Sequence, residues 1–192
     1  MIKIFIDLET TGTDVKKHSI HQIAGLIEIN GILVEDFNFK TAPHPKAICE
    51  PEAMRICKVT EDQIRGYNDM VVVHGQFIKM LSKYINRYDK KDKAYMIGFN
   101  NRSFDDVFLR SWFEQCSDMF FGSWFWSDSL DCLVLASQYL LDRRAEMPSF
   151  QLLRVATELG IEVDKDKVHD AVYDVSITRQ IYRIVTGLEI EL

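Results

Sequence analysis

The sequence predicts an α/β fold: a mixed five-stranded sheet, antiparallel at one edge and parallel elsewhere, flanked by helices. Strand-like segments with tight connections come first, and strand-like segments alternate with helical ones after them. The 192 residues are 47% hydrophobic, enough for one well-packed core, and they show no internal repeat, linker or low-complexity tract. We therefore expect a single domain spanning residues 1–192.

Three early segments predict the antiparallel edge of this sheet. The apolar run Ile2–Leu8 is typical of a strand that is buried on both faces. Gln22–Ile29 and Ile32–Phe39 flank Asn30-Gly31, a dipeptide that strongly favours a two-residue hairpin turn. Further along, the short apolar segment Ala94–Phe99 predicts a parallel strand.

Helices are predicted from apolar periodicity and from capping residues. Thr60 to Gln63 fits a capping box, and Gly66 fits the end of the same helix. Ser149 fits the start of another helix, which ends at Gly160. The expected helices are Pro51–Lys58, Thr60–Gly66, Val72–Tyr88, Ser103–Cys116, Ser149–Gly160 and His169–Thr186.

Composition excludes several functional classes. A net charge of −6 argues against a broad basic surface for duplex nucleic acid, but not against an acidic pocket whose bound ions reverse the local field. The four cysteines lack C-x-x-C spacing and are expected to be reduced and structural. No apolar run approaches the ~20 residues of a membrane span, and no signal peptide is evident, so we expect a cytoplasmic protein without a membrane partner.

Acidic residues recur at one kind of structural position. Asp7 and Glu9 end the first predicted strand and, as residues i and i+2, point to the same face. Asp105 follows the strand at Ala94–Phe99 and opens a helix, and Asp174 lies near the start of the last helix. Each acid alone would be an ordinary surface or helix-start residue. Together they occupy the strand ends and helix starts where open α/β sheets place their ligand sites.

Carboxylates in this arrangement suggest metal chemistry. Oxygen donors suit Mg²⁺ or Mn²⁺ better than zinc. Two such ions ~4 Å apart would hold the attacking and leaving oxygens of a phosphodiester during an in-line displacement. His169, with an ordinary pKa near ~6.5, could take the proton from the attacking water. It lies ~140° from Asp174 around a regular helix, so the two converge only if His169 precedes or opens the first turn.

The segments DLETTG, NRSFD and HDAVYD resemble, in this order, the three motifs of the DEDDh 3′–5′ exonuclease family. The resemblance extends from Ile2 to about Thr186 and implies a ribonuclease H-like fold. A sister subgroup carries tyrosine four residues before the last acid, where this chain has Asp170, so the histidine subgroup fits. The resemblance implies that His169 is the general base and that two Mg²⁺ or Mn²⁺ ions are bound by Asp7, Glu9, Asp105 and Asp174.

The same resemblance implies contacts with the terminal nucleotide. Leu8, Thr10 and Thr11 match the segment that receives it through backbone groups and the 3′-hydroxyl. Phe104 matches a position beside the scissile end, although core packing is an equally good interpretation. The apolar wedge against the last bases would be Ile56, and Asn101 of the middle motif completes the predicted substrate contacts.

Some positions depart from the family pattern. Cys57-Lys58 stands where relatives often carry His-Gly, and Asn100 stands where histidine is common. Arg102 replaces a small residue and has two interpretations: a contact with a substrate phosphate or an ion pair with Asp106. These departures concern the choice of substrate more than the reaction.

An aromatic stretch, Met119–Trp126, holds five aromatic residues in eight. One interpretation is a platform on which unpaired bases stack. The other is a buried strand that leads into a helix at Ser129, with tryptophan as core filler, and strand composition favours it. Exposure of Trp124 or Trp126 would reverse that preference, and an exposed patch could equally mark a protein partner.

We therefore expect a metal-dependent 3′–5′ exonuclease that hydrolyses phosphodiester bonds at single-stranded or frayed 3′ ends and releases nucleoside 5′-monophosphates. DNA is the expected substrate. One alternative is a 3′–5′ exoribonuclease, because a pocket that reads the 2′-hydroxyl has no sequence signature. Another is a nucleic-acid-binding or polymerase-accessory module with the same fold and little turnover. A polymerase or other protein partner stays open.

Overall fold

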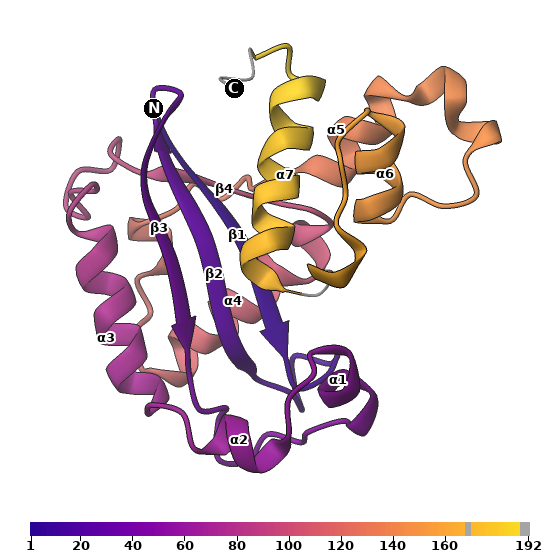
Figure 1. Ribbon diagram of the computed structural model, residues 1–192. Coiled ribbons are helices and arrows are strands. Elements are labelled where there is room, and N and C mark those ends of the chain that lie inside the picture. The colour runs from indigo at the N-terminus through magenta and orange to yellow at the C-terminus, as the bar shows by residue number, and fades with distance from the viewer. Residues whose placement is uncertain (168–169, 189–192) are drawn as a thin grey trace.

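The structure, a computed structural model, describes residues 1–167 and 170–188 and is built on a five-stranded mixed sheet (Figure 1). The strand order is β3-β2-β1-β4-β5. β2 pairs antiparallel with β1 and with β3, whereas β4 runs parallel to β1 and β5 parallel to β4. The predicted mixed sheet is thereby confirmed. The strands are β1 (Ile2–Thr10), β2 (Ile20–Ile29), β3 (Ile32–Lys40), β4 (Ala94–Gly98) and β5 (Leu130–Asp131).

The turn between β2 and β3 is the predicted two-residue hairpin. Asn30 and Gly31 have φ values of 52° and 94°, and positive φ at both central residues is what the favoured hairpin turn requires. Ile29 pairs with Ile32 directly beside the turn. Local turn chemistry therefore sets the register of this edge.

Seven α-helices and four short 3₁₀-helices are assigned in the described residues. The α-helices are α1 (Pro51–Ile56), α2 (Glu61–Arg65), α3 (Met70–Leu81), α4 (Asp105–Gln115), α5 (Cys132–Tyr139), α6 (Leu152–Glu158) and α7 (Ala171–Val185). The 3₁₀-helices are η1 (Asn101–Ser103), η2 (Phe121–Ser123), η3 (Leu141–Glu146) and η4 (Lys165–Lys167). None of the described helices is both long and apolar enough to cross a bilayer.

Successive side chains of β1 point to opposite faces of the sheet, and each face carries its own hydrophobic core. Ile4, Ile6 and Leu8 join the core that includes residues of α3 and α4, whereas Phe5 joins the core formed with α5, α6 and α7. Figure 1 shows α7 lying along the strands on this second side. Because alternate residues share a face, Asp7 and Glu9 project on the same side as Phe5, toward α7.

A buried carboxylate fixes α7 on the sheet. Glu28 of β2 is 1% exposed and accepts from Lys3 Nζ at 3.1 Å and from Arg179 Nε at 3.0 Å, and Arg183 Nη1 lies 3.5 Å away. Burial alone would raise the pKa of Glu28, but the hydrogen bonds and charges of Lys3 and Arg179 lower it below its usual range. Since Arg179 and Arg183 belong to α7, this network sets the rotation of the helix that carries Asp174.

The end of α3 and the start of α6 lie away from their predicted positions. α3 ends at Leu81 rather than Tyr88, although Ile85 stays buried in the core. The apolar periodicity thus continues past the point where the chain leaves the helix. α6 begins at Leu152 after Gln151, so Ser149 does not cap it. By contrast, the Thr60 hydroxyl accepts from the Gln63 amide as predicted at the start of α2.

The predicted buried strand at Met119–Trp126 is wrong. The chain forms the 3₁₀-helix η2 there and touches the sheet through one parallel bridge, between Ala94 and Phe125. The following helix, α5, begins at Cys132 with Asp131 as its cap rather than at Ser129.

The interpretation of tryptophan as core filler holds for part of the same stretch. Trp124 and Phe125 are each 1% exposed and belong to the core, while Trp126 is half-buried. Met119 and Phe120 are 73% and 59% exposed. The stretch is therefore divided between the interior and the surface.

Candidate active site

Four carboxylates from three parts of the chain meet near the carboxyl ends of β1 and β4. Asp7 and Glu9 come from β1, Asp105 is the first residue of α4, and Asp174 lies in the first turn of α7. The Leu8 amide donates to Asp105 Oδ1 at 3.0 Å, which fixes the start of α4 against β1. We call Asp7, Glu9, Asp105 and Asp174 the four-acid cluster.

Burial and mutual repulsion raise the pKa values of this cluster. The pKa of Asp7 is well above its usual range, first because it is buried and then because Asp105, Glu9 and Asp174 lie nearby. Burial, with Asp174 and Asp170, raises the pKa of Glu9 to about 7 against an opposing hydrogen bond from Cys57.

The pKa of Asp105 is raised as well. Burial is the largest cause that raises its pKa to about 8, opposed by hydrogen bonds from its own amide and that of Leu8, with Glu9 and Asp131 adding repulsion. The pKa values of Asp7, Glu9 and Asp105 are all raised. The cluster therefore holds protons near neutral pH unless a cation enters.

The cluster fits a divalent cation in charge and donor type. In the described part of the chain, no lysine, arginine or histidine is among the groups that shift the pKa of Asp7, Glu9 or Asp105. Carboxylate oxygens are the ligands that Mg²⁺ and Mn²⁺ prefer. However, no group of three or more His, Cys, Asp or Glu side chains among the described residues forms a ready ion cage. Closing on an ion therefore requires rotation of carboxylates such as Glu9 and Asp105, each of which already accepts a hydrogen bond.

Cys57 is the residue that sequence reasoning did not place in the site. It follows α1 as its C-cap, is half-buried, and its thiol donates to Glu9 Oε2 with Sγ and Oε2 2.9 Å apart. Burial, followed by the charge of Glu9, raises the pKa of the thiol far above its ordinary value, so Cys57 stays a protonated donor. The only sequence signal was that cysteine stands here where relatives often carry His-Gly.

A cavity of about 200 Å³ opens beside Glu9 and Cys57. Of the predicted substrate contacts, four line it: Leu8, Thr10, Ile56 and Phe104. Phe104 also packs on Phe108, with ring centroids 4.9 Å apart, which confirms its interpretation as a packing residue. Its place beside the scissile end stays a prediction. The wall from α1 is completed by Glu52 and Ala53.

Two predicted contacts lie away from this cavity. Thr11 is fully buried, and its hydroxyl accepts from the Ser19 amide while its own amide donates to the Ser19 carbonyl. Asn101 is 1% exposed in η1, close to Gly98, and its side-chain amide has no hydrogen-bond partner in the described residues. Both residues shape the loops around the site rather than line the cavity.

The loop after β1 is held by a histidine that the sequence did not single out. His18 Nδ1 accepts from the Asp14 amide at 2.8 Å, and His18 Nε2 lies 3.1 Å from Glu50 Oε1. A Cβ on Gly12 would lie 2.7 Å from the His18 ring, so only glycine fits there. Thr10 Oγ1 donates to the Gly12 carbonyl, and this places Thr10 at the cavity wall.

Arg102 is exposed, and it makes no ion pair among the residues that the structure describes. The predicted pair with Asp106 is wrong, because Asp106 Oδ1 instead accepts from Arg110 Nε at 2.5 Å and Oδ2 accepts from Ser129. The contact of Arg102 with a substrate phosphate stays a prediction.

His169 lies outside the described residues. The chain resumes at Asp170, whose carboxylate accepts from the Val172 and Tyr173 amides and caps α7. This cap starts the helix at Ala171 and leaves Asp174 in its first turn.

Comparisons with known proteins agree with this architecture. A family model described as exonuclease, RNase_T, matches residues 4–182. Among solved structures, E. coli exonuclease I in complex with a dT13 oligonucleotide is 22% identical with a TM-score of 0.75, covering 96% of this chain and 41% of that one. Its complex with a dA16 oligonucleotide is 22% identical with a TM-score of 0.77, covering 98% and 41%.

A zinc-bound form of the E. coli exonuclease I complex with single-stranded DNA is also 22% identical, with a TM-score of 0.77, covering 97% of this chain and 40% of that one. The chain thus spans about 41% of the length of such relatives, and the likeness shows the fold. A search of curated protein sequences finds no match.

Proposed function

Because this chain belongs to the RNase_T exonuclease family, we propose that it is a metal-dependent 3′–5′ exonuclease of the DEDDh type. Its substrate would be a single-stranded or frayed 3′ end of DNA, and its products nucleoside 5′-monophosphates. The oligonucleotide complexes of exonuclease I support single-stranded DNA as the substrate class.

The observation that carries this proposal is the four-acid cluster. A fold has no structural need to bring Asp7, Glu9, Asp105 and Asp174 together, since their mutual repulsion costs stability. Two Mg²⁺ or Mn²⁺ ions, held by these carboxylates, would stabilise charge on the scissile phosphate and activate a water. His169, close in sequence to Asp174, would accept the proton of that water.

The remaining side chains would position the strand end. The cavity beside Glu9 has walls from β1, from α1 and from Phe104 between η1 and α4, and it would take the terminal nucleotide. Ile56 and Phe104 offer apolar surface for the last base. Backbone groups at Leu8 and Thr10 lie at the same wall and would receive the sugar and its 3′-hydroxyl.

The test is Mg²⁺-dependent shortening of 5′-labelled single-stranded DNA and RNA of matched sequence. We expect a ladder that shrinks from the 3′ end, no shortening by Asp7→Ala, and strongly slowed shortening by His169→Ala. Asp142→Ala, at an exposed acid of η3, is the matched control and should behave as wild type. Faster RNA shortening would favour the exoribonuclease. Binding of either strand without shortening in Mg²⁺ or Mn²⁺ would leave a binding module instead.

A further inference from the structure

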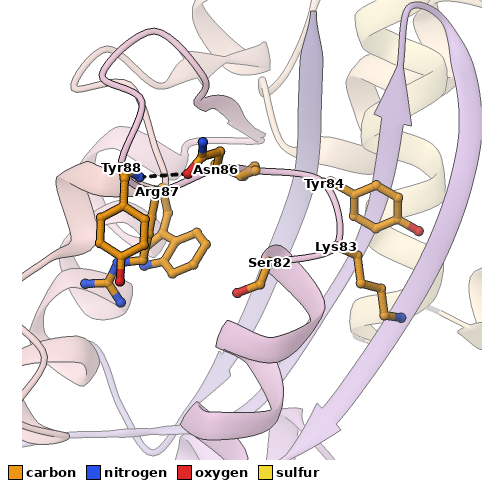
Figure 2. Close-up of a pocket in the computed structure, with 8 residues that line it drawn as sticks. Ser82, Lys83, Tyr84, Asn86, Arg87 and Tyr88 are labelled. Carbon is orange, nitrogen blue, oxygen red and sulfur yellow. Dashed lines mark hydrogen bonds between the residues drawn. The ribbon is translucent and has the colours of Figure 1, made fainter.

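A second feature lies at the opposite end of the sheet from the four-acid cluster. The loop after α3 forms a shallow depression of about 550 Å³, lined by residues 82–88 and Trp124 (Figure 2). This loop runs into Ala94, the first residue of β4, whereas Asp105 follows the other end of that strand. The five residues of β4 alone separate the two places by about 16 Å.

Arg87 is the central cation of this depression. Its guanidinium lies 5.1 Å from the ring centre of Phe120, 5.2 Å from that of Trp124 and 5.8 Å from that of Tyr88. Seven of the ten arginines in the sequence form ion pairs with carboxylates: Arg55, Arg65, Arg110, Arg143, Arg154, Arg179 and Arg183. Arg87 has no carboxylate partner in the described residues. Rings orient it, and its hydrogen-bond donors stay available for an anion.

The surrounding loop is basic in an acidic protein. Residues 83–93 contain five lysines and arginines and two aspartates, a net charge of +3 in a chain of net charge −6. Lys83 pairs with Glu35, but Lys90, Lys91 and Lys93 form no ion pair among the residues that the structure describes. Lys93 Nζ lies 5.3 Å from the ring centre of Trp126. Two of the unpaired cations of this loop, Arg87 and Lys93, therefore lie beside aromatic rings.

Two rings of this loop region face solvent. Tyr88 is 88% exposed and Phe120 is 59% exposed. Figure 2 shows Arg87 and Tyr88 on one side of the loop and the side chains of Lys83 and Tyr84 on the other, where both bond Glu35. The Tyr88 amide donates to Asn86 Oδ1 at 3.2 Å, which steadies the turn.

We propose that this basic aromatic patch, defined as Arg87, Tyr88, Lys90, Lys91, Lys93 and Phe120, binds single-stranded nucleic acid through phosphates and stacked bases. Exposed rings interleaved with unpaired cations are the combination that sequence-tolerant single-strand binding uses. An apolar protein partner would instead need an enclosed groove without free cations, and this patch is open and basic. If the bound strand is the substrate itself, held by the nucleotides that precede its 3′ end, this inference rests on the proposed function.

The distance between the cavity beside Glu9 and the basic aromatic patch predicts that the KM depends on the length of the strand. At about 3.4 Å per stacked nucleotide, roughly five nucleotides span 16 Å. A tetranucleotide in the cavity would not reach the patch, whereas a 20-mer would. The patch should therefore lower the KM of long strands and leave that of tetranucleotides unchanged.

The test measures fluorescence anisotropy of labelled dT20 and rU20 in EDTA, where no turnover complicates binding. Tyr88→Ala should weaken binding about five-fold or more, the lower end for one base–aromatic stack. Arg87→Ala should lower the slope of log affinity against log salt by about 0.7 for each lost phosphate contact. Arg144→Ala is the matched control, because Arg144 lies 4.6 Å from the Phe150 ring, has no carboxylate partner in the described residues, and is far along the chain.

The variants should keep the wild-type circular dichroism and cleave a tetranucleotide at the wild-type rate. Asp7→Ala, which removes the proposed catalysis, should retain patch-dependent binding, so that failure of the nuclease proposal and of this one are separable. Wild-type affinity for dT20 and rU20 in both patch variants would overturn the proposal. A second result would also overturn it: the patch variants lose binding to an acidic polypeptide, such as polyglutamate, but keep binding to both oligonucleotides. That result would assign the patch to a protein partner.

Discussion

Replacement of Cys57 by alanine tests whether its thiol keeps Glu9 ready for a metal ion. The thiol donates to Glu9 Oε2 at 2.9 Å, and this hydrogen bond lowers a carboxyl pKa that burial and other acids raise to about 7. Cys57→Ala removes the donor and leaves the other causes in place. The pKa of Glu9 should therefore rise further.

The size of the effect follows from the geometry. A hydrogen bond to a charged group contributes about 1.5–3 kcal/mol, and a weak thiol donor in a half-buried position belongs at or below the lower end. About 1.4 kcal/mol corresponds to one pKa unit, which would move Glu9 to about 8. At pH 7 the ionised fraction would fall from about one half to about one tenth. The apparent affinity for Mg²⁺ should then fall about five-fold.

The assay is the Mg²⁺ concentration needed for half-maximal cleavage of a 5′-labelled strand, measured from pH 6 to pH 9. Cys57→Ala should need about five times more Mg²⁺ at pH 7 and approach wild type at pH 9, where Glu9 is ionised in both. Cys57→Ser, which keeps a donor, should recover most of the difference. Cys116→Ala, at a half-buried thiol beside Met70, is the control. An unchanged Mg²⁺ requirement at pH 7 would refute this account of the thiol.

Other predictions concern stability. The pKa values of Glu9 and Asp105, raised to about 7 and about 8, mean that the folded state binds protons more tightly than the unfolded chain. The metal-free protein should lose about 6 kcal/mol as pH rises from about 5 to 8, and Mg²⁺ at pH 8 should restore much of it. A Tm in EDTA that is flat with pH would contradict this. In urea denaturation, Gly25→Ala should cost about 3 kcal/mol or more, because its Cβ would lie 2.2 Å from the Phe37 ring and 2.5 Å from a backbone oxygen. Gly75→Ala, inside α3 with open space around it, should instead stabilise by up to about 1 kcal/mol, and equal effects of the two would contradict the packing argument.

Local chemistry explains what could be predicted from sequence. The hairpin at Asn30-Gly31 follows from the φ values that a two-residue turn demands, and these depend on the two residues alone. The face shared by Asp7 and Glu9 follows from strand periodicity once β1 is recognised. Such features need no knowledge of distant parts of the chain.

The errors arose where tertiary packing decides. Ile85 continues the apolar period of α3, yet it reaches the core from a turn, so periodicity alone places the helix end too late. The stretch Met119–Trp126 has the composition of a strand but pairs with β4 through a single bridge. The bond from Cys57 to Glu9 joins residues 48 positions apart, and no local pattern encodes it.

The buried network around Glu28 also has a consequence for the order of events during synthesis. Asp7 and Asp174 are 167 positions apart, and Asp174 reaches the site only when α7 docks through Arg179 and Arg183. At roughly 5–20 residues per second, a ribosome makes Asp174 about 8 to 33 seconds after Asp7. A nascent or prematurely terminated chain therefore holds an incomplete acidic cluster throughout that interval. The arrangement delays the proposed activity until α7 has been translated and has docked on the sheet.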